Sequence, residues 1–124
     1  MSSQQQTIEQ KRAKAAWDDV LAVKRQGDYD DKYLSLVRSA PPDVLTNGLG
    51  QTLAFLKAKG QSEHRDLFRH LSRWVCPQMG WAASDDLLRK LTEPGAGSDV
   101  YRRATAETLA YLVWLKRFAE AELG

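Results

Sequence analysis

The chain has 124 residues and a mass of 14.0 kDa, which is the size of one domain, since domains centre near about 100 to 150 residues. Eighteen Lys and Arg oppose 16 Asp and Glu. The resulting net charge of +2 excludes both a polycation that coats nucleic acid and an acidic tail. A hydrophobic fraction of 43% is that of an ordinary globular chain and excludes disorder along the whole length.

Cysteine content and hydropathy restrict the compartment. Cys76 is the only cysteine, so neither an intramolecular disulfide nor a Cys-rich zinc site nor a CxxC redox pair can form. The polar N-terminus lacks the apolar core of a secretory signal, and the longest apolar run, residues 109–115, is far shorter than the roughly twenty residues that a membrane-spanning helix needs. We expect a cytoplasmic protein without a membrane span.

Helical spacing of apolar residues dominates the chain, and no run alternates with the period of two that is typical of a strand. The first predicted helix follows Thr7 as N-cap, carries Trp17 and Val20 on its apolar stripe, and ends at Gly27. We expect six helices in all.

The second predicted helix is short, capped by Asp28 or Asp30, and ends at the proline pair 41–42, because a residue before proline avoids the α region. The third, residues 42–59, is ambiguous because Asn47-Gly48 is also a hairpin signal. No strand-like run flanks that dipeptide, so the sequence favours a helix there.

The last three helices follow clearer punctuation. Ser62 is expected to cap the fourth, which runs to Pro77, and Ser84 to cap a short fifth. Ser98 is expected to cap the last and longest helix, which runs to about Glu122 after a Pro and Gly breaker.

Apolar residues at 109–115 occupy every side of that last helix, which is typical of a helix surrounded by others. The predicted fold is all-α, a compact bundle of about six helices with a long, largely buried C-terminal helix. Residues 1–6 are predicted to be a flexible tail and residues 7–124 a single helical domain. The four tryptophans are interpreted as core residues rather than as base-stacking platforms: Trp17, Trp74, Trp81 and Trp114.

No constellation for catalysis or metal binding is recognisable. His64 and His70 are six apart and point in different directions on one helix, and Cys76 is interpreted as a packed small hydrophobe. Asp28 begins only part of a calcium-loop pattern, because Tyr33 stands where the sharp turn needs Gly. We expect no metal, no cofactor and no enzymatic activity.

Gly48 and Gly50 resemble the start of a dinucleotide fingerprint, but Leu53 stands where the third Gly belongs and no strand precedes them. The two glycines allow close approach of either another helix of the chain or a nucleic-acid backbone, and the sequence does not separate these alternatives.

The distribution of charge carries more information than its total. Residues 51–76 hold five basic and two acidic side chains, against two and four in residues 27–50. Arg65, Arg69 and Arg73 lie four apart and so form a stripe on one helix face, although like charges at that spacing weaken their own helix. The stripe indicates either an anionic partner or a solvated face paired with Glu63 and Asp66.

Two stretches of the sequence form recognisable motifs: residues 47–57 (NGLGQTLAFLK), and the C-terminal Tyr101-Arg102 with Thr105, Glu107, Leu109 and residues 114–121 (WLKRFAEA). Both resemble the small-subunit family of type III-B CRISPR effector complexes, and residues 12–16 and 20–24 are similar to the first helix of that family. The resemblance covers most of the chain in consistent order.

This resemblance implies an all-helical, non-catalytic subunit of an antiviral ribonucleoprotein, stacked in several copies beside the backbone subunits. The implied partners are the backbone and large subunits, guide RNA, target RNA and neighbouring copies of the chain itself, and no membrane. Phosphate contacts along a guide–target duplex carry no sequence information, as is needed where base pairing supplies specificity.

The candidate RNA-binding residues have two sources. Lys57, Arg102, Lys116 and Arg117 are basic and fall on the motif positions, whereas the Arg65, Arg69 and Arg73 stripe rests on spacing alone. The full predicted set is Lys57, Lys59, Arg65, Arg69, Arg73, Arg102, Lys116 and Arg117.

Two alternative functions stay open. A stand-alone DNA-binding regulator would use the short fifth helix and the last helix as a helix-turn-helix, although the connection 92–97 is long for that motif. A ribonuclease would need a general acid and base that the sequence does not place.

Overall fold

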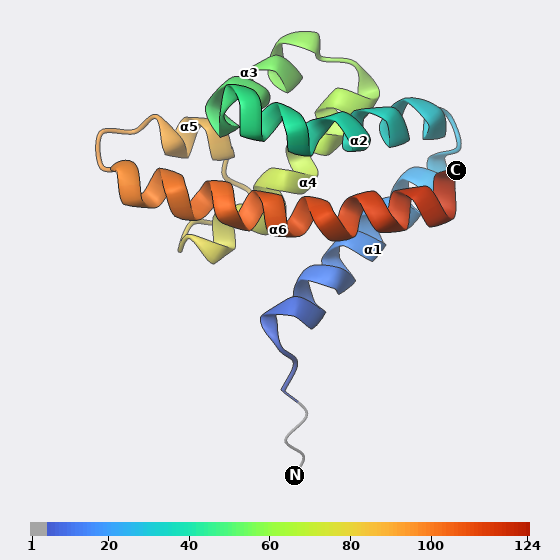
Figure 1. Cartoon of the computed structure of the whole chain (residues 1–124), viewed down its shortest axis with the longest axis horizontal. Coiled ribbons are helices and arrows are strands. Elements are labelled where there is room, and N and C mark those ends of the chain that lie inside the picture. The colour runs from blue at the N-terminus through green and yellow to red at the C-terminus, as the bar shows by residue number, and fades with distance from the viewer. Residues whose placement is uncertain (1–4) are drawn as a thin grey trace.

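The computed structural model describes residues 5–124 and contains six helices within that range (Figure 1). Residues 1–4 of the predicted flexible tail lie outside the described residues. The helices are α1 (Ile8–Gln26), α2 (Asp30–Asn47), α3 (Leu49–Lys59), α4 (Ser62–Gln78), α5 (Leu87–Leu91) and α6 (Ser98–Leu123). The predicted all-α class is confirmed.

The long helix α6 organises the bundle. It extends across the width of the molecule, with α2 running back alongside it, while α1 passes behind it at an angle and extends below it in this view (Figure 1). Helix α6 packs on α1, α2 and α4, whereas α3 packs between α2, α4 and α5. The core lies where these helices pack against one another.

The ends of α1 agree with the sequence. The Thr7 hydroxyl accepts a hydrogen bond from the Gln10 N–H at 3.1 Å, and the Gln10 side chain accepts one from the Thr7 N–H at 2.8 Å, which is a capping box. Gly27 ends the helix with φ +73°, a left-handed conformation that glycine adopts without strain.

The predicted boundary between the second and third helices is wrong. Helix α2 continues through Pro41 and Pro42 and ends only before Gly48. Val37, Ala40 and Val44 of α2 are buried on one continuous face, and this burial outweighs the backbone hydrogen bonds that the prolines cannot make. Gly48, with φ +89°, separates α2 from α3.

Three predicted serine caps are also wrong by one or two residues. Ser62 and Ser98 are the first residues of α4 and α6, and the cap positions before them make no side-chain hydrogen bond. Helix α5 is capped by Asp86 instead of Ser84, and the Asp86 carboxylate accepts the N–H of Arg89 at 2.9 Å. Turns occupy most of the chain between residues 79 and 85, so α5 begins later than the sequence predicts.

The last helix buries one broad face, and Val113 on the opposite side is 58% exposed. The tryptophans lie at the edge of the core: Trp74, Trp81 and Trp114 are partly buried against it, and Trp17 is 37% exposed. The Trp17 ring packs edge-on against Phe118 with centroids 4.3 Å apart. No helix in residues 5–124 has the length and hydropathy to span a membrane.

Candidate nucleic-acid interface

Three cavities on the side of the molecule where α1 and α4 meet contain the predicted arginine stripe, and we call them together the groove. One of about 700 Å³ is lined by Arg65 and Arg69, one of about 290 Å³ by Arg69, and one of about 440 Å³ by Arg73. The predicted stripe therefore lies along an open depression and does not cover a convex helix face.

Arg73, at one end of this groove, pairs with Asp19, one of four buried polar residues, and we call the five together the inner cluster: Asp19, Tyr33, His70, Arg73 and Tyr111. The Arg73 guanidinium and the Tyr111 hydroxyl both donate to the Asp19 carboxylate, which is only 4% exposed. Burial raises the pKa of Asp19, although both donors oppose that rise. Arg73 thus stabilises a buried charge.

His70 completes the inner cluster. Its Nδ1 lies 2.7 Å from the Tyr33 hydroxyl, and its Nε2 faces Asp19 Oδ1 at 3.9 Å without a hydrogen bond. Burial, reinforced by the charges of Arg73 and Arg69, lowers the pKa of His70 to about 3. The imidazole is therefore neutral at physiological pH.

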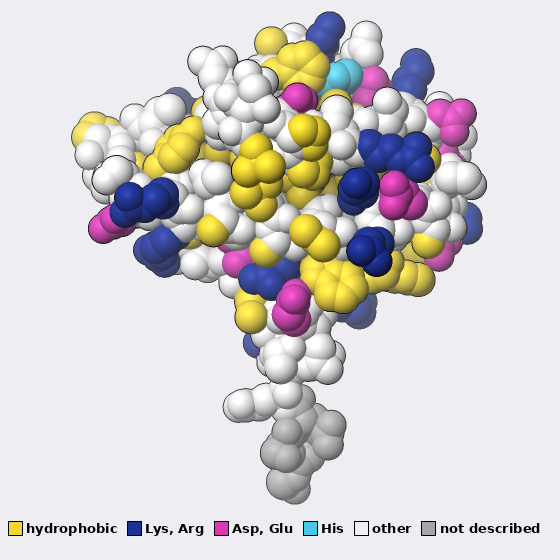
Figure 2. Space-filling model, in the orientation of Figure 1, with side chains coloured by type: hydrophobic (Ala, Val, Ile, Leu, Met, Phe, Trp, Pro, Cys, Tyr) yellow, Lys and Arg dark blue, Asp and Glu magenta, His cyan; other side chains and the backbone are white. Residues whose placement is uncertain are grey.

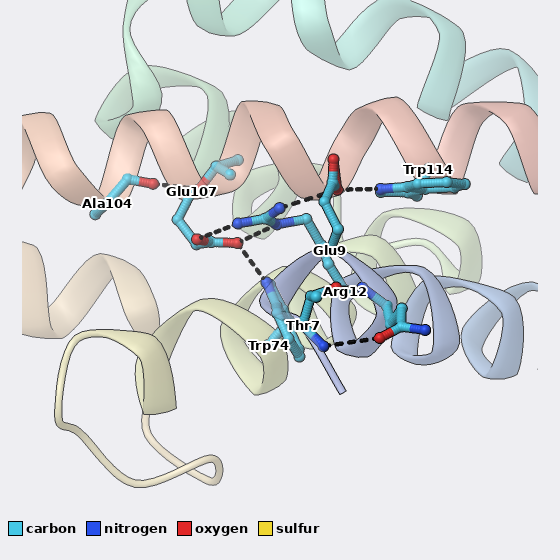
Figure 3. Close-up of polar contacts among 9 residues, drawn as sticks. Thr7, Glu9, Arg12, Trp74, Ala104, Glu107 and Trp114 are labelled. Carbon is cyan, nitrogen blue, oxygen red and sulfur yellow. Dashed lines mark hydrogen bonds and ion pairs between the residues drawn. The ribbon is translucent and has the colours of Figure 1, made fainter. Parts of the chain in front are cut away.

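A second set of polar groups, the outer cluster, ties α1 to α4 and α6 and comprises Glu9, Arg12, Trp74, Glu107 and Trp114 (Figure 3). Arg12 donates to both oxygens of Glu107, at 2.7 and 2.9 Å, and the Trp74 indole N–H donates to the same carboxylate at 2.7 Å. Burial opposes ionisation, but these donors outweigh it and lower the pKa of Glu107.

The middle of the arginine stripe is partly neutralised. Arg69 pairs with Asp66 at 3.0 Å, and the Tyr29 hydroxyl donates to the same carboxylate. Burial and the neighbouring Asp66 raise the pKa of Tyr29 to about 12. Arg65 lies one turn nearer the N-terminus of α4. It is exposed and makes no ion pair with any residue from 5 to 124.

The two predicted lysines of α3 lie near its C-terminal end. Lys57 pairs with Asp86, and its ammonium lies 5.3 Å from the centroid of the Phe68 ring. Lys59 lies 5.8 Å from the centroid of the Phe55 ring. Of the two, only Lys57 lines the cavity of about 700 Å³ that contains Arg65 and Arg69.

The predicted basic residues of α6 form a separate group. Arg102 pairs with Asp99 at the start of the helix, both side chains being largely exposed. Lys116 and Arg117 are exposed and lie about four turns further along. On the face shown in Figure 2, lysine and arginine side chains are scattered among acidic and hydrophobic ones and form no continuous band.

Sequence reasoning missed two contributors to the groove. Arg25 of α1 and Tyr29 of the α1–α2 turn line its cavities together with the α4 arginines. The only signal in the sequence was the position of Arg25 near the end of the first helix. That position does not indicate which other helix packs beside Arg25.

The close approach predicted at Gly48 and Gly50 is made by the chain itself. The Gly50 N–H donates to the Tyr101 hydroxyl oxygen at 2.7 Å, and a Cβ at position 50 would lie 3.2 Å from that oxygen. This is the packing alternative, in which the start of α6 lies against the start of α3.

The residues considered for chemistry are not assembled into a site. No group of three or more His, Cys, Asp or Glu within residues 5–124 is arranged to hold a metal. Cys76 is fully buried, and burial raises the pKa of its thiol to about 11, so little thiolate forms at neutral pH.

Comparison with known proteins places this architecture in a family. A model of the CRISPR-associated Cas_Cmr5 family matches residues 8–122. The chain belongs to the Cmr5 family. It is 35% identical over 98 residues to the CRISPR system Cmr subunit Cmr5 of Thermus thermophilus, covering 77% of this chain and 75% of that relative.

The fold agrees with the same family. A crystal structure of a CRISPR-associated Cmr5 family protein from Thermus thermophilus superposes with a TM-score of 0.78 at 29% identity. The match covers 94% of this chain and 98% of that one. The resemblance read from the sequence is confirmed. The chain belongs to the small-subunit family of type III-B CRISPR complexes.

Proposed function

We propose that this chain is a non-catalytic subunit that stacks in several copies beside the backbone subunits and lends a basic surface to the guide RNA–target RNA duplex. Membership of the Cmr5 family supports the assembly role. The observation that carries the RNA contact is the groove between α1 and α4, where Arg65 and Arg69 line one open cavity.

The eight candidate residues do not contribute equally to this surface. Arg65 and Arg69 have exposed guanidinium groups at the groove, which suits contact with a phosphate backbone. Arg73 is half exposed but is held by Asp19. Lys57 lines the same cavity as Arg65 and Arg69, and Lys59 follows it at the end of α3. Arg102, Lys116 and Arg117 would form a second, separate contact along α6.

The partners follow from the same proposal: the backbone and large subunits, the two RNA strands, and further copies of this chain. A cytoplasmic location is proposed with them, since that is where such a complex meets foreign RNA. No catalytic role is proposed for any residue; both histidines are largely buried, His64 beside Glu63 and His70 beside Tyr33.

The test compares charge reversal of Arg65 and Arg69 with charge reversal of Lys116 and Arg117. Binding to a paired RNA is measured by fluorescence anisotropy over a series of salt concentrations. We expect the groove variant to lose affinity and to lower the salt slope by about one per lost phosphate contact. Equal affinity of both variants and the parent chain would refute the basic surface.

The assembly role needs its own measurement. The tagged chain, co-expressed with the backbone subunits and a guide RNA, is expected to recover both on purification. Recovery of the chain alone would contradict the proposal. A DNA-binding regulator is not favoured, because α5 spans only Leu87–Leu91 and one side of α6 is buried against α1, α2 and α4.

A further inference from the structure

Two adjoining cavities that share lining residues form one depression, which we call the α1–α4 cleft. The cavity of about 700 Å³ lies where the α1–α2 turn, the end of α3 and the first turns of α4 meet. The adjoining cavity of about 290 Å³ shares Gln26, Asp66 and Arg69 with it and adds Arg25. The larger volume falls in the range of small-molecule sites, about 300–1,000 Å³, and the smaller lies at its lower edge.

The wall of the cleft is apolar and aromatic. Leu56, Phe68 and the ring of Tyr29 line the larger cavity. The Lys57 ammonium lies over the Phe68 ring, 5.3 Å from its centroid, so a group that packs on this ring from the cleft does so beside Lys57. A flat aromatic ligand would replace water at this wall and gain stacking energy there.

The charges of the cleft are divided between neutralised and available groups. Asp66 is engaged by Arg69 and Tyr29. Arg65 in the larger cavity and Arg25 in the smaller are exposed and form no ion pair with any residue from 5 to 124. The cleft therefore offers two guanidinium groups for phosphates beside one aromatic wall.

Gln26 and Asp28 complete the lining. Both are exposed, and both line the larger cavity. The amide oxygen of Gln26 and the carboxylate of Asp28 can accept hydrogen bonds from the N–H groups at the edge of a nucleobase. A bare phosphate or a hydrophobic ligand has no such N–H groups. The combination fits a nucleotide better than a simple anion.

We propose that the α1–α4 cleft takes one unpaired nucleotide of an RNA strand, with its base against Phe68 and Tyr29 and its flanking phosphates on Arg25 and Arg65. A paired base is held in its stack and cannot enter a cleft, whereas a splayed base can. This inference rests on the proposed RNA contact and adds a preference for unpaired positions to it.

The experiment compares two RNA duplexes that are identical except for one bulged 2-aminopurine. Anisotropy gives the affinity of the full-length chain for each RNA, and 2-aminopurine fluorescence reports the surroundings of the bulged base. We expect the bulged RNA to bind about fivefold tighter or more, in line with one aromatic stacking contact, and its fluorescence to change on binding.

Phe68→Leu keeps an apolar side chain but removes the aromatic face, and is expected to abolish the preference while leaving affinity for the paired RNA within about twofold. Phe55→Leu is the matched control, because Phe55 is an exposed aromatic residue of α3 outside the cleft. Arg25→Gln, a surface change in α1, should weaken the preference as well and does not depend on how Phe68→Leu folds.

Equal binding of the two RNAs by the parent chain would overturn the inference. Retention of the preference in both Phe68→Leu and Arg25→Gln would do the same. Free AMP that displaces the bulged RNA at equal concentration would show a site for a free nucleotide and would also overturn it. In each of these cases affinity for the paired RNA, which the Arg65 and Arg69 variant tests, still decides the proposed function.

Discussion

The inner and outer clusters both connect α1, α4 and α6, and the inner cluster also reaches α2 through Tyr33, but the electrostatics of the two clusters are opposite. In the inner cluster, burial dominates and the pKa of Asp19 is raised; in the outer cluster, donors dominate and the pKa of Glu107 is lowered. Both carboxylates receive an arginine and an aromatic donor. Both oxygens of each carboxylate accept a hydrogen bond, so the difference is depth: the Asp19 side chain is 5% exposed and the Glu107 side chain is 16% exposed.

This difference separates two roles for the arginines of α1 and α4. Arg73 and Arg12 each stabilise a carboxylate of the fold, so their charges are already committed. Arg65 and Arg25 carry the same charge with no partner in the part of the chain that the structure describes. Predictions of RNA contacts from charge alone do not make this distinction.

The largest effect is expected from Asp19→Ala. The change leaves the buried Tyr111 hydroxyl without its acceptor and removes the partner of Arg73, and should lower the free energy of unfolding by about 3 kcal/mol. Urea unfolding measures it. Asp18→Ala, an exposed neighbour paired with Lys14, should cost no more than about 0.5 kcal/mol. Equal losses would contradict a buried role for Asp19.

Glu107→Ala tests the outer cluster. Arg12 and the Trp74 indole N–H both lose an acceptor, and we expect a loss of about 2 kcal/mol in the free energy of unfolding. Glu122→Ala on the same helix removes only a more exposed pair with Lys24 and should cost about 0.5 kcal/mol. If both variants unfold at the same urea concentration, the outer cluster contributes nothing beyond a surface pair.

A smaller effect should separate the two ends of the stripe. Arg73→Gln weakens the contact with Asp19 and should cost about 1 kcal/mol, whereas Arg65→Gln should stay within about 0.5 kcal/mol of the parent chain. Thermal or urea unfolding of the two variants provides the comparison. A larger loss for Arg65→Gln would mean that this residue also has a structural partner.

The smallest effect is on the pH dependence of stability. The lowered pKa of Glu107 contributes stability above its unfolded value near 4.5, and this contribution is lost as the pH falls through the folded pKa. The raised pKa of Asp19 has the opposite sign, because the folded state gains stability as Asp19 is protonated.

Urea midpoints between neutral pH and acid test this pair of signs. Glu107→Gln should make the chain less sensitive to acid, and Asp19→Asn should make it more sensitive. Changes of the same sign in both variants would show that the two clusters do not differ as described.

Local signals predicted much of the fold. The capping box at Thr7 and the stop at Gly27 are encoded within a few neighbouring residues. The proline pair led to a wrong helix end because prolines locally disfavour a continuing helix. This local preference was outweighed by the burial of Val37, Ala40 and Val44, which depends on other helices.

The candidate site was predictable only in part. Four-residue spacing placed Arg65, Arg69 and Arg73 on one face, and the structure confirms that arrangement along the groove. The spacing did not reveal that Arg73 forms an ion pair with Asp19. That contact joins residues 54 positions apart, and the contact between Arg12 and Glu107 joins residues 95 apart, so no local pattern encodes either.

The buried thiol of Cys76 has a practical consequence for measuring distances in an assembled complex. Because the only native cysteine is fully buried with a pKa of about 11, maleimide reagents at neutral pH should spare it. A cysteine introduced at an exposed position such as Leu45, which is 73% exposed, can then carry a single fluorophore or spin label without prior replacement of Cys76.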